Sequence, residues 1–364
     1  MAKKSQDMNI LDVKKIVDGL NVCRKICGAD KFNMVFGGKN CHICMQSDLN
    51  KVDYLVEDCL DVEQKGEISF NVETFLGSIG RFGKCAFAIE DTTIKFKSGK
   101  SSGNITTQPY EEIVVLPEKV ESLFNFDTLK DIILKVLPSV CITPTPHLSQ
   151  DESALEVIIE GSKEGIKFLC ADRYHGVLAT VNQKSEKFKL NFPLTYTNLL
   201  SLFDKKFELS MDSNCIYLHN KKLKLCVPQI VCNSVVDING FVNLFESSKK
   251  EFTIKKFSIG EFEEALNSAS SVLTEAVDIC MKIKNGTMKV YCSSELGEVS
   301  TDIDVEAKKD MSEKVLQYDT IYDVLDICDK KATLNVYENF LQFGFTKDDV
   351  DYIVLGTLGE YRQK

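Results

Sequence analysis

This chain of 364 residues has no long apolar run, few prolines and no excess of positive charge. No apolar run approaches the roughly 20 residues that a membrane-spanning helix needs. Only 7 residues are proline, and there is no low-complexity tract. The first residues are polar and lack the apolar core of a secretory signal peptide. We therefore expect a globular cytoplasmic protein that does not bind a membrane.

Positive charge is in the minority, with a formal net charge of −10 at pH 7. This argues against a simple basic nucleic-acid-binding protein. It leaves open a protein whose Lys and Arg residues gather on one inner surface, because the local field matters more than the sum. Phosphate-binding motifs of the G-x-x-x-x-G-K-[ST] and G-x-G-x-x-G types are missing, as is the G-x-S-x-G nucleophile elbow. We expect neither ATP hydrolysis nor a cofactor.

Cysteine is abundant, but its fourteen residues are scattered singly through apolar segments. Without an export signal we expect reduced thiols that act as small buried hydrophobes. The spacing of Cys23, Cys27, Cys41 and Cys44 superficially matches a zinc site. However, Cys41 and Cys44 lie in an extended stretch, where an odd separation sends side chains to opposite faces. Two buried apolar pairs are favoured over zinc.

One pattern occurs three times along the chain. Residues 67–79, 188–200 and 315–327 each run from an extended apolar segment into a short helix. The copies are roughly 120 residues apart, far more than the 20–50 residues of solenoid repeats. A repeat of this length indicates a whole small domain copied in tandem.

Each copy also has a similar first half. Residues 10–23, 126–137 and 257–269 have apolar residues at helical spacing. Alternating segments follow, and strand pairs at 86–97, 207–218 and 333–345 turn at short polar stretches. The sequence therefore predicts an α+β fold of three domains, 1–122, 123–248 and 249–364, each with two helices on a curved antiparallel sheet.

This layout resembles the bacterial DNA sliding clamp, the β subunit of the replicative DNA polymerase. The matching segments are Ser294–Glu298 with the acidic strand Thr301–Glu306, the strand Ile94–Ser101, the stretch Ala171–His175, and the ending Asp351–Leu358. Gly356 and Thr357 stand where the family usually has Pro and Met, and Tyr174 and His175 depart from its Gly-His-Arg. These departures indicate a divergent member, of bacterial or viral origin.

The resemblance implies that the three domains form half of a ring, which a head-to-tail homodimer closes around double-stranded DNA. Such a protein is a processivity factor and not an enzyme. Its implied partners are DNA of any sequence, a replicative DNA polymerase and a clamp loader. Its implied location is the nucleoid or replication site in the cytoplasm of a bacterial or virus-infected cell.

The twelve helices of such a ring would face DNA, and their exposed Lys and Arg would attract phosphates without reading bases. The third domain fits poorly, because its first helix carries Glu261, Glu263 and Glu264. We therefore expect an uneven lining, although each lysine could also be an ordinary solvated residue of an amphipathic helix. The candidate DNA-binding residues are Lys14, Lys15, Arg24, Lys25, Arg81, Lys84, Lys130, Lys135, Lys205 and Lys206.

The resemblance also places a groove for short apolar peptides of replication proteins between the second and third domains. Carried over by position, its residues are Leu155, Ala171, Tyr174, His175, Val177, Ile353 and Leu355. For Ile353 and Leu355 an ordinary place in the core of a strand is the competing interpretation.

Two other functions compete with the sliding clamp. One is a clamp-fold interaction protein that binds replication partners as a monomer without encircling DNA, which the acidic third domain and the net charge keep open. The other is an enzyme that uses Cys170 and His175, with Asp172 nearby. Side chains so close along one strand rarely form a catalytic triad.

Overall fold

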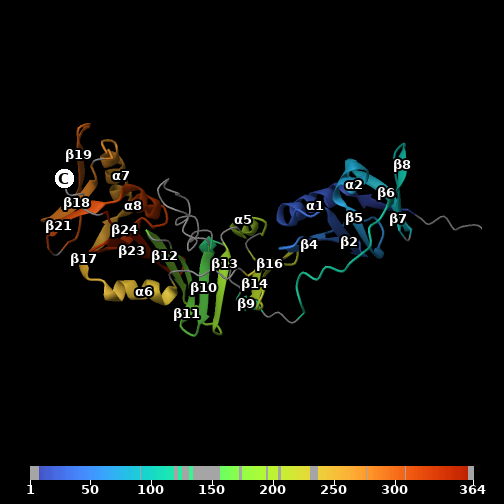
Figure 1. The fold of residues 1–364 in the computed structure, drawn as a ribbon, viewed down its shortest axis with the longest axis horizontal. Helices are drawn as coiled ribbons and strands as arrows, with labels where there is room; N and C mark the ends of the chain where they lie inside the picture. The colour runs from blue at the N-terminus through green and yellow to red at the C-terminus, as the bar shows by residue number, and fades with distance from the viewer. Residues whose placement is uncertain are drawn as a thin grey trace, which may run out of the picture. The chain divides into compact units, whose positions relative to one another are not determined.

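The computed structural model describes most of the chain in two compact units (Figure 1). Unit 1 comprises residues 1–127 and 198–229, and unit 2 comprises residues 128–197 and 230–364. The described residues are 8–90, 92–118, 122–124, 131–133, 156–171, 174–193, 196–203, 206–229, 237–275, 277–307 and 309–359. The three-domain division stays a prediction, because these two units cut through its second domain.

Unit 1 contains two antiparallel sheets and the helices that cover them. Its helices are α1 (Val13–Cys27), α2 (Val72–Gly77) and the 3-10 turn η1 (Ile79–Arg81), and most of the short α5 (Thr197–Leu200) also belongs to it. Its strands are β1 (Asn9–Asp12), β2 (Lys31–Gly38), β3 (Asn40–Gln46), β4 (Lys51–Val56), β5 (Gln64–Asn71), β6 (Lys84–Glu90), β7 (Thr93–Ser98), β8 (Ser101–Thr106), β9 (Ser122–Phe124), β14 (Glu208–Met211), β15 (Cys215–His219) and β16 (Leu223–Pro228).

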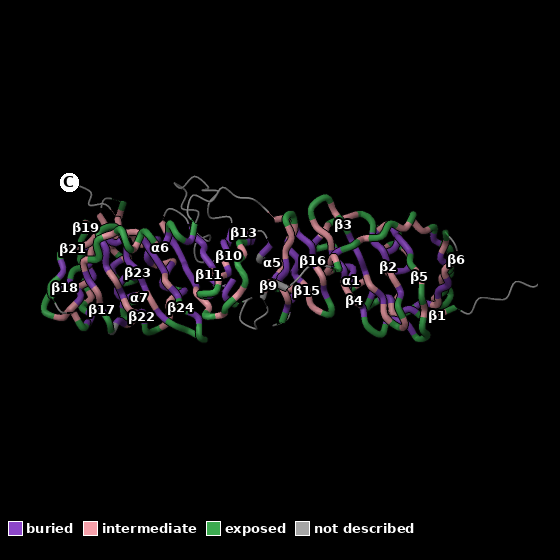
Figure 2. The backbone as a smooth tube through the Cα atoms, turned by 90° about the horizontal axis from the view of Figure 1, so that it is seen from below, coloured by how far each residue is buried: buried purple, intermediate pink, exposed green. Residues whose placement is uncertain are grey.

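The larger sheet of unit 1 has eight strands in the order β5-β2-β3-β4-β16-β15-β14-β9, and the smaller has the order β1-β6-β7-β8. In the larger sheet, β4 and β16 pair from Leu223↔Tyr54 to Cys226↔Lys51. Residues about 170 positions apart in the chain therefore share one sheet. Buried positions are concentrated in the strands, several in succession as at residues 32–34 of β2, and exposed positions lie mainly in the turns (Figure 2).

Unit 2 repeats this plan. Its helices are α6 (Ile238–Ser247), α7 (Ile259–Ser270) and α8 (Tyr318–Leu325). Its strands are β10 (Glu156–Ser162), β11 (Gly165–Ala171), β12 (His175–Val181), β13 (Phe188–Pro193), β17 (Lys250–Ser258), β18 (Ile279–Lys284), β19 (Thr287–Ser294), β20 (Gly297–Asp304), β21 (Met311–Leu316), β22 (Lys331–Tyr337), β23 (Phe340–Lys347) and β24 (Val350–Thr357). They form an eight-stranded sheet, β13-β10-β11-β12-β24-β23-β22-β17, and a four-stranded sheet, β20-β19-β18-β21.

The predicted α+β fold and its hairpins are confirmed. The predicted first helix begins later than expected, because Ile10–Asp12 pair with β6 instead. Asp12 then caps α1 by accepting a hydrogen bond from the Lys15 backbone N–H, and Gly28 ends it in the left-handed conformation. Of the predicted helix at 126–137, only residues 131–133 are described, and they are helical. Within the described ranges no helix is long and apolar enough to cross a bilayer.

Helices cover both faces of the eight-stranded sheet of unit 2. Two successive residues of β24 face different helices. A Cβ on Gly356 would lie 3.0 Å from Ile321 of α8. Leu355, the residue before it, packs in an apolar cluster with residues of α6. Because successive side chains of a strand point to opposite faces, α8 and α6 lie on opposite sides of the sheet. In Figure 1, α7 and α8 lie on one side of these strands and α6 on the other. The α6 side is called the outer face below.

The two-residue turn that joins β23 to β24 has a backbone conformation that suits a different pair of residues. Asp348 and Asp349 have φ of 51° and 61° between the paired residues Lys347 and Val350. Positive φ at both positions favours Asn-Gly, since a Cβ is strained there. Replacing the pair by Asn-Gly should raise the free energy of unfolding by about 1 kcal/mol in urea titration. An equal gain from Asn-Gly at a turn without positive φ would contradict this explanation.

Candidate functional site

The exposed face of α1 presents two candidate DNA-binding lysines. Lys14 and Lys25 are exposed and eleven residues apart, so they lie on one face of the helix. The opposite face buries Ile16, Leu20 and Cys23 against the sheet. This amphipathic pattern fixes which side chains of α1 are available to a ligand. Asp18 shares the exposed face and reduces its net charge.

The other two basic residues of α1 have partners within unit 1. Lys15 donates from Nζ to the carbonyl oxygens of Glu57 (3.2 Å) and Asp58 (3.0 Å). Arg24 lies 3.4 Å from the Glu73 carboxylate of α2. Exposed pairs of this kind exchange readily with solvent, so Arg24 can still reach a phosphate. Lys15 is held by two carbonyls and is the poorer candidate.

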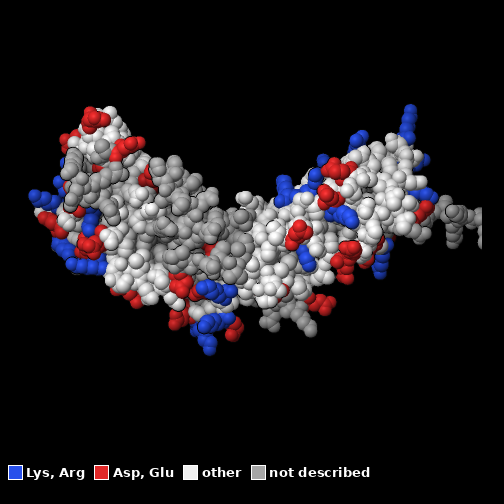
Figure 3. Space-filling model, in the orientation of Figure 1, with Lys and Arg blue, Asp and Glu red and all other residues white. Residues whose placement is uncertain are grey.

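Two further basic residues lie near the start of α1. The Lys14 backbone N–H donates to the Gly83 carbonyl at 3.3 Å, which brings the segment containing Arg81 and Lys84 beside the helix. Both side chains are exposed, as is Lys206 after α5. Lys130, Lys135 and Lys205 lie outside the described residues. Basic and acidic side chains mingle over α1 and α2 in Figure 3, so this surface of unit 1 carries charges of both signs.

The helices of the third predicted domain have the opposite character. Glu261 and Glu264 are exposed on α7, and α8 adds the exposed Asp319. Tyr318 and Tyr322 stack on α8 with ring centroids 5.4 Å apart. Lys330 and Lys331, also exposed, are the basic residues that follow α8. The charge along the exposed helix faces is therefore uneven, as the sequence indicates.

The residues predicted to form the peptide groove separate onto two faces of the sheet. Ala171 and Leu355 are buried in one apolar cluster on the outer face, and Ile353 packs against it. Val177 pairs with Val354, and His175 with Gly356, so both belong to the opposite face. Tyr174 is half-buried just before β12, and Leu155 lies outside the described residues. Three of the seven residues therefore share an apolar surface.

Helix α6 covers that surface, and the sequence analysis did not predict it. Ile238 and Phe241 are fully buried against Ile158, Leu169, Ala171, Leu178, Tyr337, Phe340 and Leu355, and Val242 and Phe245 are half-buried beside them. The helix crosses the junction of β12 and β24, where the strands of the second and third predicted domains meet. Its signal was present in the Asp237 N-cap and in the i, i+3, i+4, i+7 spacing of its apolar residues.

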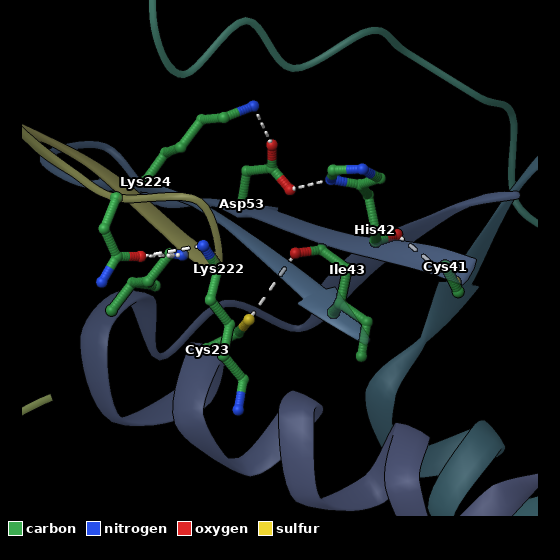
Figure 4. Close-up of polar contacts among 9 residues, drawn as sticks. Cys23, Cys41, His42, Ile43, Asp53, Lys222 and Lys224 are labelled. Atoms are coloured by element: carbon green, nitrogen blue, oxygen red, sulfur yellow. Dashed lines mark hydrogen bonds and ion pairs between the residues drawn. The ribbon is translucent and has the colours of Figure 1, made fainter. Parts of the chain in front are cut away.

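The two cysteines of α1, Cys23 and Cys27, are a buried and a half-buried thiol. Cys23 donates to the Ile43 carbonyl at 3.6 Å (Figure 4). Cys27 donates to the Asn50 carbonyl at 3.4 Å. Burial raises the pKa of Cys27 to about 12 and raises that of Cys23 too, which disfavours the thiolate that binds metals. Across the part of the chain that the structure describes, no group of three or more His, Cys, Asp or Glu side chains could hold a metal ion.

A buried carboxylate connects three strands of unit 1. Asp53 of β4 accepts hydrogen bonds from His42 Nδ1 of β3 (2.7 Å) and Lys224 Nζ of β16 (2.9 Å), as Figure 4 shows. Burial alone would raise the pKa of Asp53, but these two hydrogen bonds outweigh it and lower the pKa below its ordinary value. The carboxylate thus ties β16 to β4 across the junction of the first and second predicted domains.

This arrangement predicts how the stability of unit 1 depends on pH. The folded-state pKa of Asp53 is below the unfolded value of about 3.9, so its contribution is present above that pH and is lost as the pH falls through the folded value. Asp53→Asn should lower the free energy of unfolding by about 2 kcal/mol at pH 7. The deficit should shrink below about pH 4. Urea titrations at pH 7 and below about pH 4 measure both deficits, with Asp48→Asn, a change of an exposed carboxylate, as the control. A deficit that is the same at both pH values would contradict this explanation.

Each smaller sheet ends in a strand with one hydrogen-bonded neighbour. β8 pairs with β7, and β20 pairs with β19; both are the last strands of their sheets among the described elements. Lys95, Lys97 and Lys100 are exposed on or next to β7, and Glu298, Asp302 and Asp304 are exposed on β20. At each of these edges a strand from another chain can extend the sheet, beside lysines of β7 in one case and along acidic side chains of β20 in the other.

The folds of solved DNA polymerase sliding clamps match this architecture. No family model matches the chain, and neither does any curated protein at the sequence level. The structural likeness covers nearly the whole length. The DNA polymerase sliding clamp of Bacillus subtilis is 13% identical with a TM-score of 0.73, over 98% of this chain and 100% of that one.

Two other solved structures give the same result. The β clamp of Helicobacter pylori is 12% identical with a TM-score of 0.75, over 98% of this chain and 100% of its own. The DNA polymerase III β subunit of Pseudomonas aeruginosa is 11% identical with a TM-score of 0.72, over 97% and 100%. The chain therefore has the β-clamp fold.

Proposed function

We propose that this protein is a DNA sliding clamp, a non-enzymatic processivity factor that encircles double-stranded DNA as a head-to-tail dimer. The observation that carries the proposal is the pair of free sheet edges, basic beside β8 and acidic along β20, in a chain with the β-clamp fold. A contact between β8 of one chain and β20 of another is head-to-tail, and such contacts close into rings when the rotation allows. A clamp loader and a replicative polymerase would be its partners.

Weak attraction for DNA suits this function. A ring stays on DNA because it encircles it, so base contacts would only hinder sliding. Exposed lysines on α1 supply non-specific attraction for phosphates, while the acidic α7 and α8 keep that attraction modest. Polymerase tethering is assigned to the outer apolar surface around Ala171, Ile353 and Leu355.

The mass of the protein in solution tests this proposal directly. Sedimentation equilibrium should give twice the chain mass of 40.9 kDa. A monomer at micromolar concentration would instead support the interaction protein that does not encircle DNA. Because the two outcomes differ by a factor of two in mass, the measurement separates them without any DNA.

Charge reversal on α1 should weaken the attraction for DNA. Lys14→Glu with Lys25→Glu removes two phosphate contacts, so the slope of log K against log salt should fall by about 2. Fluorescence anisotropy with a short duplex at several salt concentrations measures this slope. The control is Lys163→Glu, an exposed lysine in the β10–β11 turn. An equal loss in the control would show that only net charge matters.

A further inference from the structure

The groove assigned to partner peptides already holds a helix of the same chain. Phe241 of α6 lies so close to β12 that a Cβ on Gly176 would come within 2.2 Å of its ring. Gly176 pairs with Leu355, one of the predicted groove residues. Ile238 reaches the same cluster from the first turn of the helix. In this structure the side chains of α6 occupy the space beside Ala171 and Leu355.

The two halves of α6 are held unequally. The N-terminal half is anchored by the Asp237 cap and by Ile238 and Phe241, which are 1% and 3% exposed. From Val242 onward, Val242 and Phe245 are only half-buried, and Leu244 is 39% exposed. The later residues of the helix are therefore less buried than Ile238 and Phe241.

Aromatic contacts define what the groove selects. Phe245 packs edge-on against Phe241 (5.1 Å between centroids) and Phe340 (5.6 Å), and Tyr337 stacks on Phe340 at 4.3 Å. Glu246 is the only charged residue among the ten of α6. The apolar surface under α6 thus accommodates a nearly uncharged helix whose aromatic side chains are four residues apart.

We propose that α6 is an intramolecular ligand of the partner groove, and that a partner binds there by displacing its C-terminal half with a helical segment of the same aromatic pattern. This rests on the proposed function, because it concerns the groove through which the clamp would tether its partners. When α6 occupies the groove, the apparent Kd of a competitor is its intrinsic Kd divided by the fraction of time that the groove is open. Partner binding is then limited by release of α6.

The test uses the full-length chain and a fluorescein-labelled peptide with the sequence of residues 237–248. Val242→Ala with Phe245→Ala weakens the docking of α6 in cis, so this variant should bind the peptide at least ten-fold more tightly than the unchanged chain. Leu244→Ala is the matched control: it lies on the same helix outside the apolar cluster and should bind like the unchanged chain. A variant that melts cooperatively but binds the peptide no more tightly would overturn the proposal.

A second measurement does not depend on any variant. Hydrogen exchange of the unchanged chain should show faster exchange of the α6 amides of residues 242–247 when the peptide is in excess, because the peptide takes their place. Unchanged or slower exchange would identify α6 as a fixed wall and overturn the proposal. Neither experiment requires DNA or a dimer. A negative result here would therefore not contradict the proposed ring, and evidence against the ring would not contradict a positive result here.

Discussion

Chains that carry Glu298→Lys and Asp304→Lys should sediment as monomers at concentrations where the unchanged chain is a dimer. Both acids are exposed on β20, and their cross-strand neighbours on β19 are Ser293 and Thr287, so the opposed pair Lys289 and Asp302 stays intact. At a β8–β20 contact the new lysines would face the basic side of β7. Like charges brought together at an interface cost several kcal/mol, which corresponds to at least about a hundred-fold weaker dimer.

A charge swap provides the control for this effect. Adding Lys97→Glu and Lys100→Glu to the same chain reverses the basic side as well, so both interfaces of a head-to-tail ring regain opposite charges. Lys97 lies opposite Ala86 and Ser102, so its reversal creates no like-charged pair within the sheet. The fourfold variant should dimerise again. Continued dissociation would mean that the two edges do not meet.

Gly176→Ala should strongly destabilise unit 2. The added Cβ would lie 2.2 Å from the Phe241 ring, which is 3% exposed and held by Phe245. Because the ring has no free space, it must leave its site, and the free energy of unfolding should fall by about 3 kcal/mol. Urea denaturation followed by circular dichroism measures the loss. Gly344→Ala, where a Cβ meets nothing within 4 Å, is the matched control.

A double-mutant cycle identifies the clash as the cause. Phe241→Ala alone should cost about 4 kcal/mol by leaving a cavity. In the Gly176→Ala background the same change also removes the clash, so the combined loss should be smaller than the sum by at least about 1 kcal/mol. Strict additivity would show that Gly176 and Phe241 do not constrain each other.

Local patterns along the chain were sufficient to predict the α+β fold. The hairpins were readable because period-two strands flank short polar turns, as at β6–β7 and β22–β23. The main error in α1 was its start, where apolar residues at helical spacing extend into β1. Periodicity alone does not show that Ile10 pairs with Ala86 of a distant strand. Long-range pairing decided that boundary.

The candidate sites were less accessible to sequence reasoning. Exposure of Lys14 and Lys25 follows from the amphipathic spacing of α1, but the carbonyl partners of Lys15 come from a loop more than 40 residues away. The groove residues were assigned by resemblance. That assignment did not take into account that successive side chains of a strand alternate between faces, which places Val177 and Ile353 on different faces of the sheet. Helix α6 was missed because its ten residues lie next to the predicted domain boundary at 248, outside the repeated helix–strand pattern on which the domains were based.

Retention on closed DNA tests the central claim most directly. Protein loaded onto a nicked circular plasmid, with a clamp loader supplied, should stay with the DNA during gel filtration in high salt and be lost when a single cut linearises the plasmid. That result follows only if the ring encircles the duplex, since salt screens ordinary phosphate contacts. Equal loss from circular and linear plasmids, or equal retention on both, would contradict the account.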